Sequence, residues 1–349
     1  MISDRKLQHI EICKNEDVEH HRTTGYEDIE LVHRTLPEVD YDKIDTSIDL
    51  FGKKIDTPLI ISAITGGHEV SKGINRELAV ATENKNIALG VGSQRAGITD
   101  ENLTDTFTVV REYAPNSFII GNIGAPQVEY APKAIEMLET DALAIHLNPL
   151  QEIIQPEGDV NAEGYIKDIE EICQITDSPI IAKETGAGID GRDAKILEDI
   201  GVDAIDIQGV GGTSWAAVET YRAENPKLGN LFWDWGIPTV VSTIEVLEST
   251  SLPVISSGGM RNGLEAAKAI SLGATSVGIA LPFLKYAYEG HEFIEEKIDQ
   301  FTRELKTAMF LVGASNIEDL KQKRLVITGK TREILTELNI DTKKYARRI

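Results

Sequence analysis

Charged and amide side chains recur in this sequence directly after short apolar runs. Lys183 closes one run, and His146 closes another with Asn148 two residues further on. In an extended segment the side chains of His146 and Asn148 face the same way. Gln151 and Glu152 follow at once. An ammonium, an imidazole, two amides and a carboxylate could together bind an anion, hold a divalent metal and transfer protons.

These residues belong to a repeating pattern of strands and helices. Eight apolar runs are continuous rather than alternating, which is typical of parallel strands buried on both faces. The runs are Pro58–Ile64, Ile87–Val91, Phe118–Asn122, Ala142–Leu147, Pro179–Lys183, Ala204–Gln208, Pro253–Ser257 and Ser276–Ala280. Helical periodicity marks Val70–Lys85, Ala131–Glu139, Asn161–Gln174, Asp190–Asp199, Ile237–Ser249 and Gly263–Leu272. Eight strand–helix units predict an α/β protein with a closed (β/α)8 TIM barrel.

The barrel accounts for residues 58–289, with an N-terminal extension at 1–57 and a C-terminal helical segment at 290–349 packed on the barrel. Gly290–Leu311 has an amphipathic pattern, and Ile317–Leu325 is expected to form one more helix. Residues 215–236 are rich in Trp, Asn, Gly and charge. A long loop over the barrel mouth is the structure we expect there.

A phosphate site is predicted after the last two strands, because barrel active sites are built at the carboxyl ends of the strands. Gly258 and Gly259 form a Gly-Gly turn before a helix, and Ala280 closes the eighth strand. Backbone N–H groups of such a turn and of a helix N-terminus bind phosphate well. The alternative is that the two glycines serve only a tight turn.

Lys183 is expected to be nearly buried at the barrel mouth. An unpaired buried ammonium is costly, so it should have an anionic partner. The N1–C2=O edge of a reduced flavin is the partner that we favour. An ion pair with Glu184 or Asp206 and a Schiff-base role are the alternatives.

Glu152 could hold Mg²⁺ through one carboxylate, with substrate phosphates and water completing the shell; otherwise it is a surface glutamate. Arg5 and Lys6 form a basic pair that could clamp a diphosphate against Arg95 and His146. A simple charged tail is the alternative.

Composition excludes several classes of protein. The 349 residues carry a net charge of −22, with 57 acidic against 35 basic residues, which disfavours nucleic acid and anionic membranes as partners. This acidity could equally be only a solvated surface. Cys13 and Cys173 are too few for a disulfide framework, a structural zinc site or an iron–sulfur cluster. With no signal core and no long apolar run, we expect a cytoplasmic protein.

The assembled motifs resemble those of type 2 isopentenyl-diphosphate isomerases, the FMN-dependent isopentenyl-diphosphate delta-isomerases. The resemblance runs from residue 5 to about residue 285. Its most specific pieces are His146-Leu147-Asn148-x-x-Gln151-Glu152 and Gly211-Gly212-Thr213-Ser214-Trp215, and it also includes Arg5-Lys6-x-x-His9, Ala63-Ile64-Thr65-Gly66-Gly67, Gly92-Ser93-Gln94-Arg95, Lys183-Glu184 and Ser257-Gly258-Gly259-Met260-Arg261. Ile64 stands where a methionine is common in the family.

The resemblance implies a reaction and a set of site residues. Isopentenyl diphosphate and dimethylallyl diphosphate would interconvert by a 1,3-allylic proton shift in isoprenoid biosynthesis. Reduced FMN and Mg²⁺ would be required, NADPH would supply the reduction, and flavin N5 would be the favoured proton donor and acceptor. A homotetramer or homo-octamer is implied. FMN would contact Ala63, Ile64, Thr65, Ser93, Asn122, Lys183, Thr213, Gly259, Met260, Arg261, Ala280 and Leu281.

The substrate would contact Arg5, Lys6, Ser93, Gln94, Arg95, His146, Asn148 and Gln151, and Glu152 would ligate Mg²⁺. Gln151, His146 and Lys183 are the predicted catalytic residues, and Gln151 is expected to assist the proton relay.

The main alternative is an FMN-dependent barrel oxidoreductase of the 2-hydroxy-acid oxidase type. Such enzymes resemble one another in a His-Gly-Gly motif after strand six, whereas this sequence has Val210-Gly211-Gly212-Thr213. An inosinate-dehydrogenase-like barrel needs a cysteine after strand six, where neither cysteine lies. A non-catalytic flavin- or phosphate-binding protein is the third alternative, and the convergence of His146, Lys183 and Glu152 at strand ends argues against it.

Overall fold

Eight parallel strands close into a barrel in the computed structural model, which describes residues 2–348. The order around the barrel is β4-β5-β6-β7-β8-β9-β10-β11, and β11 pairs with β4. The strands are β4 (Leu59–Ile61), β5 (Ala88–Gly90), β6 (Phe118–Gly124), β7 (Ala142–His146), β8 (Ile180–Lys183), β9 (Ala204–Asp206), β10 (Val254–Ser257) and β11 (Ser276–Ile279). Each of the eight predicted runs contains or overlaps one strand, so the predicted TIM barrel is confirmed.

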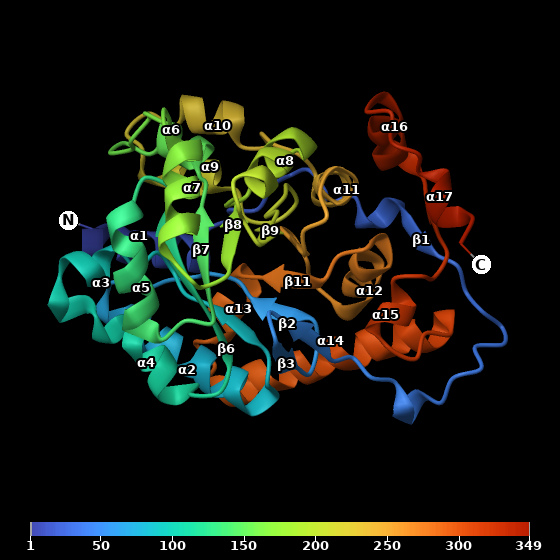
Figure 1. Cartoon of the computed structure of the whole chain (residues 1–349). Coiled ribbons are helices and arrows are strands. Elements are labelled where there is room, and N and C mark those ends of the chain that lie inside the picture. Colours follow the sequence, from blue (N-terminus) through green and yellow to red (C-terminus); the bar gives the residue numbers. More distant parts are fainter. Residues whose placement is uncertain (1, 349) are drawn as a thin grey trace.

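Helices surround the barrel and bury their apolar faces against it (Figure 1). The six helices predicted between strands are present as α2 (Glu69–Lys85), α5 (Ala131–Leu138), α7 (Tyr165–Ile175), α8 (Gly191–Asp199), α11 (Thr239–Ser249) and α12 (Gly263–Leu272). Local capping sets their starts. The Asp190 side chain, for example, accepts hydrogen bonds from the backbone N–H groups of Arg192 and Asp193 at the start of α8.

The segment 215–236 differs from the expected long loop. It contains α9 (Trp215–Arg222) and α10 (Lys227–Phe232). The Ser214 side chain caps α9 by accepting a hydrogen bond from Ala217 N, and Ala216, Ala217 and Val218 are buried. The loop prediction was wrong because this apolar face is short and is followed by a segment rich in Asn and Gly. The segment packs against α6 (Pro149–Ile154) and α1 (Ile2–Asn15) at the barrel mouth.

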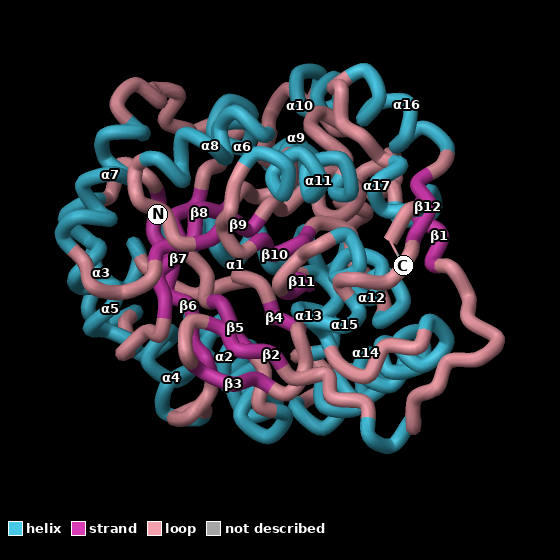
Figure 2. Tube along the Cα trace, turned by 45° about the vertical axis from the view of Figure 1, so that its right-hand side comes forward, coloured by secondary structure: helices cyan, strands magenta, loops and turns pink. Residues whose placement is uncertain are grey.

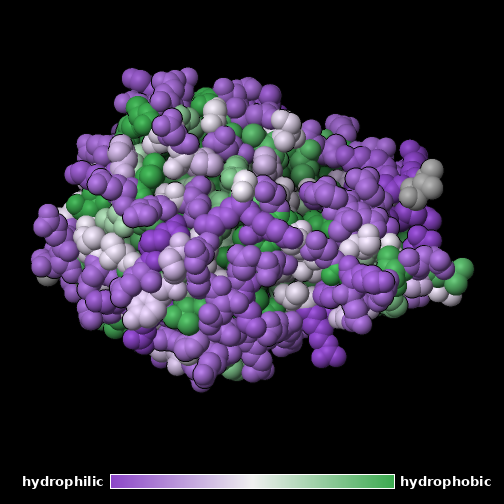
Figure 3. All heavy atoms as spheres, turned by 60° about the horizontal axis from the view of Figure 1, so that its bottom comes forward, coloured by the Kyte–Doolittle hydropathy of each residue, from purple (hydrophilic) through white to green (hydrophobic). Residues whose placement is uncertain are grey.

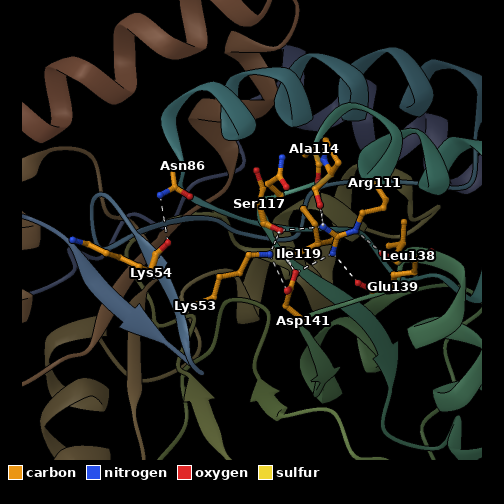
Figure 4. A network of polar contacts seen from close by, with 12 residues as sticks. Lys53, Lys54, Asn86, Arg111, Ala114, Ser117, Ile119, Leu138, Glu139 and Asp141 are labelled. Atoms are coloured by element: carbon orange, nitrogen blue, oxygen red, sulfur yellow. Dashed lines mark hydrogen bonds and ion pairs between the residues drawn. The ribbon is translucent and has the colours of Figure 1, made fainter.

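The amino ends of the strands are closed by a hairpin of β2 (Ile48–Leu50) and β3 (Lys53–Ile55). Figure 4 shows Lys53 and Arg111 converging on Asp141, just before β7. Lys53 Nζ donates to Asp141 Oδ1 at 2.9 Å, and Arg111 donates to Asp141 Oδ2 at 2.9 Å. Asp141 also accepts from the backbone N–H of Ile119 at 2.8 Å, which fixes the hairpin to the bottom of the barrel.

An N-terminal strand and a C-terminal strand meet in a second two-stranded sheet. Strand β1 (Ile29–Leu31) pairs antiparallel with β12 (Leu325–Ile327), and the two lie side by side in Figure 2. The helix predicted over 317–325 is wrong in its second half, because α15 (Ile317–Leu320) ends before β12 begins. The amphipathic segment at 290–311 forms α14 (His291–Val312). The remaining elements are α3 (Arg95–Thr99), α4 (Asp105–Tyr113), α13 (Leu281–Tyr286), α16 (Gly329–Glu337), α17 (Lys343–Ala346) and the 3-10 turns η1 (Tyr26–Asp28), η2 (Tyr41–Lys43), η3 (Glu101–Leu103) and η4 (Val128–Tyr130).

The surface seen in Figure 3 is largely hydrophilic, with hydrophobic side chains in small separate groups. This agrees with a chain that carries a net charge of −22. Between residues 2 and 348, none of the helices combines the length and the apolar character needed to cross a bilayer.

Candidate functional site

A cavity opens at the carboxyl ends of the barrel strands, and α1 forms part of its wall. Each strand or the loop directly after it contributes a lining residue: Ala63, Ser93, Asn122, His146, Lys183, Gln208, Gly258 and Ala280. Helix α1 contributes Arg5, Lys6, His9, Ile10 and Cys13. Every side chain predicted for FMN, substrate or metal lines this cavity, apart from Gln94.

Gln94 lies within the wall rather than in the cavity. Its side chain is fully buried, with Oε1 accepting from Asn122 N at 2.8 Å and Nε2 donating to Ala134 O at 2.9 Å. These two bonds connect the segment after β5 with strand β6 and helix α5. The expected substrate contact of the Gln94 side chain is therefore not supported by its position.

The Gly-Gly turn after β10 has the backbone conformation that glycine permits. Gly258 has φ 99° and Gly259 has φ 76°, and a Cβ at either position would collide with the backbone of the loop after β9. Helix α12 begins four residues later, where Asn262 accepts a hydrogen bond from Glu265 N at 2.9 Å. The Arg261 guanidinium forms an ion pair with Glu19.

Lys183 is buried at the floor of this cavity, with 7% of its surface exposed. Its Nζ donates to the backbone oxygen of Glu184 at 2.8 Å. The Glu184 carboxylate points elsewhere, because it accepts the backbone N–H groups of Thr185, Gly186 and Ala187. Burial lowers the pKa of Lys183, and the charges of Asp206 and Glu184 oppose that effect.

His146 is held as a neutral imidazole. Its Nδ1 lies 2.9 Å from Asn122 Oδ1, and Asn122 Nδ2 donates to Val91 O at 3.0 Å, which fixes the amide orientation. Nδ1 therefore carries the proton and Nε2 has the free lone pair. Burial, followed by the charges of Lys183 and Lys6, lowers the pKa of His146 to about 3.

The motif after β7 forms a connected set of amides and carboxylates. Asn148 Nδ2 donates to Gln151 Oε1 and to Glu152 Oε1, both at 3.0 Å. Gln151 Nε2 donates to Glu219 Oε1 at 2.9 Å. Glu152 Oε2 accepts from Asp159 N at 2.8 Å. The predicted proton-relay amide and metal-binding carboxylate are thus neighbours with fixed orientations.

Glu219 on α9 is a functional candidate that the sequence analysis missed. Its side chain is fully buried, His9 Nε2 lies 2.9 Å from Oε1, and Arg222 donates to Oε2. Burial raises the pKa of Glu219, but His9, Gln151 and Arg222 together hold it below its usual value. The helical spacing of Trp215, Glu219 and Arg222 was the available signal.

Helix α1 adds positive charge to the cavity wall. Arg5 Nη1 lies 3.8 Å from Glu157 Oε1. The buried Nε of Arg5 lacks a hydrogen-bond partner within the described residues. Burial, followed by the charge of Arg5, lowers the pKa of Lys6 to about 8. Arg95 also lines the cavity and is exposed. An anionic ligand would compensate all three cations.

Metal ligands are sparse. Over residues 2–348, the His, Cys, Asp and Glu side chains form no group of three suited to a metal ion. Glu152 is the carboxylate that faces the cavity beside the cationic wall. A metal here would need oxygen ligands from substrate and water, which is the usual situation for Mg²⁺.

The cavity fits a flat aromatic ring with a phosphate tail. Gly92 and Ala63 leave a wall without bulky side chains, and a Cβ at Gly92 would meet Thr65 O at 2.7 Å. The buried ammonium of Lys183 faces this space, and the turn at 258–259 lies on the same rim. Fold and cavity together define the class of FMN-binding (β/α)8-barrel proteins.

Comparison with known proteins agrees with this class and narrows it. The family model for FMN-dependent dehydrogenases matches residues 2–120 and 157–327. The isopentenyl-diphosphate delta-isomerases of Methanothermobacter thermautotrophicus and Archaeoglobus fulgidus are 56% and 51% identical to this chain. The first alignment covers 100% of both chains, and the second covers 95% of this chain and 97% of the relative. The chain belongs to the type 2, FMN-dependent family of isopentenyl-diphosphate delta-isomerases.

Solved structures of flavin enzymes share the fold at low sequence identity. Flavocytochrome b2 aligns with a TM-score of 0.69 and 22% identity, covering 94% of this chain and 84% of that chain. A mandelate oxidase aligns with a TM-score of 0.64 and 16% identity, covering 88% of this chain and 90% of the other. These similarities support the barrel architecture.

Proposed function

We propose that this protein interconverts isopentenyl diphosphate and dimethylallyl diphosphate by a 1,3-allylic proton shift, using reduced FMN and Mg²⁺. One observation carries the proposal: a cationic wall with an adjacent carboxylate and a flavin-compatible floor line the same cavity. The names of the isomerase relatives, at about half identity over the full chain, support this substrate pair.

The diphosphate would bind against Arg5, Lys6 and Arg95. Two groups would gain from an anion: the Nε of Arg5, which has no hydrogen-bond partner among the described residues, and the half-buried ammonium of Lys6. Glu152 would hold Mg²⁺, which would supply positive charge beside the diphosphate. His146 is neutral and would offer Nε2 as an acceptor or relay a proton, with its orientation set by Asn122.

The hydrocarbon part of the substrate would lie against the apolar side of the cavity. Ile10, Cys13, Trp215 and Leu284 are apolar residues of the cavity lining that are not assigned to FMN. Their packing excludes water from a reaction that develops positive charge on carbon, which protects it from hydration. Gln151 is the polar side chain nearest in sequence to the metal carboxylate, and we assign it the role of assisting proton transfer.

FMN would be held at the ring edge by Lys183 and around the ring by Ala63, Thr65, Ser93, Asn122 and Thr213. Its phosphate would lie toward the turn at 259–261, Ala280 and Leu281. When reduced, FMN would supply an electron-rich ring that stabilises positive charge and exchanges a proton. NADPH is the proposed reductant. A homotetramer or homo-octamer and a cytoplasmic location remain predictions.

The 2-hydroxy-acid oxidase alternative needs a histidine base near the turn after strand six. His20 is the histidine beside that turn, with Nδ1 3.0 Å from Gly212 O, but it packs behind the turn and does not line the cavity. The oxidase reading therefore lacks its base, and the isomerase reading is the one that the site supports.

The test is an anaerobic assay with isopentenyl diphosphate. We expect isomerisation with reduced FMN and Mg²⁺, and little turnover with oxidised FMN. Glu152→Gln should lower kcat/KM at least about 100-fold, because a neutral amide binds Mg²⁺ poorly. Lys183→Ala should lower activity and flavin content together. Equal turnover by the flavin-free protein would refute the role of FMN.

Glu163→Gln serves as the matched control for Glu152→Gln. Glu163 is an exposed residue in the loop before α7, outside the cavity lining. Its substitution removes the same charge and should leave kcat/KM unchanged. A comparable loss in both variants would show that net charge, and not a metal contact, explains the effect of Glu152→Gln.

A further inference from the structure

A buried carboxylate stands behind the floor of the cavity. Asp206 ends β9, has 6% of its surface exposed and does not line the cavity itself. Two side chains that do line the cavity, Lys183 and Gln208, lie next to it. Asp206 can therefore act on a bound flavin only through these neighbours.

Gln208 is fixed on Asp206 by several hydrogen bonds. Its Nε2 lies 3.1 Å and 3.0 Å from the two carboxylate oxygens and 3.3 Å from Ser62 Oγ. Its backbone N–H donates to Ser257 Oγ at 2.9 Å. Gln208 also has φ 41°, a left-handed conformation that costs a non-glycine residue about 1–3 kcal/mol. The surrounding bonds hold the residue in this conformation.

Asp206 has the hydrogen-bond pattern of an ionised carboxylate. Ser257 Oγ and Gln208 Nε2 both donate to it. Burial raises the pKa of Asp206, whereas the charge of Lys183 and the hydrogen bonds from Ser257 and Gln208 oppose that effect. A carboxylate that receives donors on both oxygens is best satisfied without its own proton.

Lys183 and Asp206 are register partners on the neighbouring strands β8 and β9. Both also line a small void inside the barrel, below the cavity, so their side chains enter the same apolar space. Opposite charges in such a space interact more strongly than in water. The other titratable groups that face Lys183 are His146, which is neutral, and Glu184, whose carboxylate accepts three backbone N–H groups.

We propose that Asp206 is a positioning residue for the flavin site: it keeps Lys183 as an ammonium directed at the cavity and so makes the site prefer reduced over oxidised FMN. The inference rests on the FMN binding proposed above and goes beyond it, since Asp206 touches neither flavin nor substrate. Reduced FMN carries negative charge at the N1–C2=O edge, so a fixed ammonium there stabilises the reduced form selectively.

The test is potentiometric titration of the holoenzyme. The midpoint potential of bound FMN relative to free FMN gives the ratio of its affinities for the reduced and oxidised forms. Asp206→Asn should lower this ratio at least about tenfold, because the buried amine then loses its counter-charge and its proton. Lys183→Met should lower it as much or more. The double variant should match Lys183→Met alone, because Asp206 acts through Lys183.

Two further variants make the result specific. Asp203→Asn removes the same charge just before the other end of β9, where Asp203 accepts a hydrogen bond from Ile180 N, and should leave the ratio unchanged. Ser257→Ala removes one donor to Asp206 without touching the cavity lining, and should lower the ratio about threefold. Ser257→Ala answers the question if Asp206→Asn fails to fold.

An unchanged or raised affinity ratio in a flavin-loaded Asp206→Asn protein would overturn the inference. So would additive effects in the double variant, which would mean that Asp206 acts independently of Lys183. A wild-type protein that binds no FMN would instead refute the proposed function as well. A wild-type isomerase with normal flavin but an unaffected Asp206→Asn variant would refute the inference alone.

Discussion

The protonation state of Lys6 should control the binding of an anionic ligand. Its pKa is lowered to about 8 by burial and by the charge of Arg5, so the free enzyme loses the ammonium as the pH rises through about 8. His9 and His146, which also face this region, are already neutral at that pH because burial lowers both pKa values. The proposed diphosphate binding uses this ammonium and should weaken above this pH.

We therefore predict that kcat/KM falls about tenfold per pH unit above about pH 8, since this parameter reports ionisations of the free enzyme. Lys6→Arg should remove this limb of the profile, because arginine stays protonated. The measurement is kcat/KM for isopentenyl diphosphate from pH 6.5 to about 9.5. The values below about pH 8 serve as the reference for the fall above it. The same fall in Lys6→Arg would contradict the assignment.

We expect the neighbours Gln94 and Arg95 to have different roles: Gln94 positions the wall of the cavity, and Arg95 binds the ligand. Gln94→Ala leaves Asn122 N without its acceptor inside the wall, which should lower the free energy of unfolding by about 1–3 kcal/mol. KM should change less than about threefold, because the side chain lies outside the cavity. Arg95→Ala should show the reverse: a KM raised more than about tenfold with stability unchanged, because its exposed guanidinium lies on the cavity wall.

Denaturant unfolding and steady-state kinetics on both variants test this division. A large rise in KM for Gln94→Ala at normal stability would restore the substrate contact expected from the sequence.

Most of the residues that line the cavity could be predicted, because a polar residue type at a strand end indicates a place at the barrel mouth. Lys183, His146 and Glu152 each follow an apolar run, and barrel geometry brings strand ends together. Gln94 was predicted to bind substrate, yet its side chain lies in the wall. The sequence does not tell which of two adjacent polar side chains turns inward. Glu219 was missed because its meaning depends on partners from α1 and α6, which only the fold brings near it.

At the scale of elements, strands buried on both faces could be predicted from the sequence, whereas several short or irregular segments could not. The eight barrel strands are continuous apolar runs and matched closely. The helices in 215–236 were not predicted because they are short, are separated by a segment that contains Asn225 and Pro226, and are followed by loop residues. The sequence pattern also predicts no helix in the stretch after β5, whereas α3 and α4 form there.

The turn after β10 packs so closely against the loop after β9 that a side chain at Gly259 should disturb it. A Cβ at Gly259 would collide with Gly211 and with Thr24 from the N-terminal segment, in addition to the strain of φ 76°. Gly259→Ala should therefore displace the turn, lower FMN affinity at least about tenfold and destabilise the fold by more than about 1 kcal/mol.

Gly290→Ala is the matched control, because Gly290 has φ 99° but its added Cβ would meet only Glu77 Oε2 at 3.9 Å. It should cost about 1 kcal/mol of strain alone and leave FMN affinity unchanged. Fluorescence titration with FMN and thermal unfolding distinguish the two variants. Equal flavin affinity in both would show that the turn is not part of the phosphate site.

At the scale of the whole molecule, the contacts between distant segments were beyond prediction. Strand β1 near the start of the chain pairs with β12 near its end, and each has three residues. Such short strands have no distinctive alternation, so their pairing and register follow from the fold around them. The same holds for the β2–β3 hairpin, whose Lys53 reaches Asp141 across the bottom of the barrel.

Adjacent residues of β12 allow this closure of the chain to be tested. Leu325 is fully buried opposite Leu31, whereas Val326 on the other face is 37% exposed. Leu325→Ala should lower the free energy of unfolding by about 2–5 kcal/mol, because it leaves a cavity in the core. Val326→Ala should cost less than about 1 kcal/mol, because little buried area is lost.

Urea unfolding of both variants measures the difference. Turnover per folded molecule should stay at the wild-type value in both, since β12 contributes nothing to the cavity lining. If the two substitutions cost the same, the buried face of β12 is not what ties the end of the chain to its start, and the stability of the second sheet must come from its backbone pairing alone.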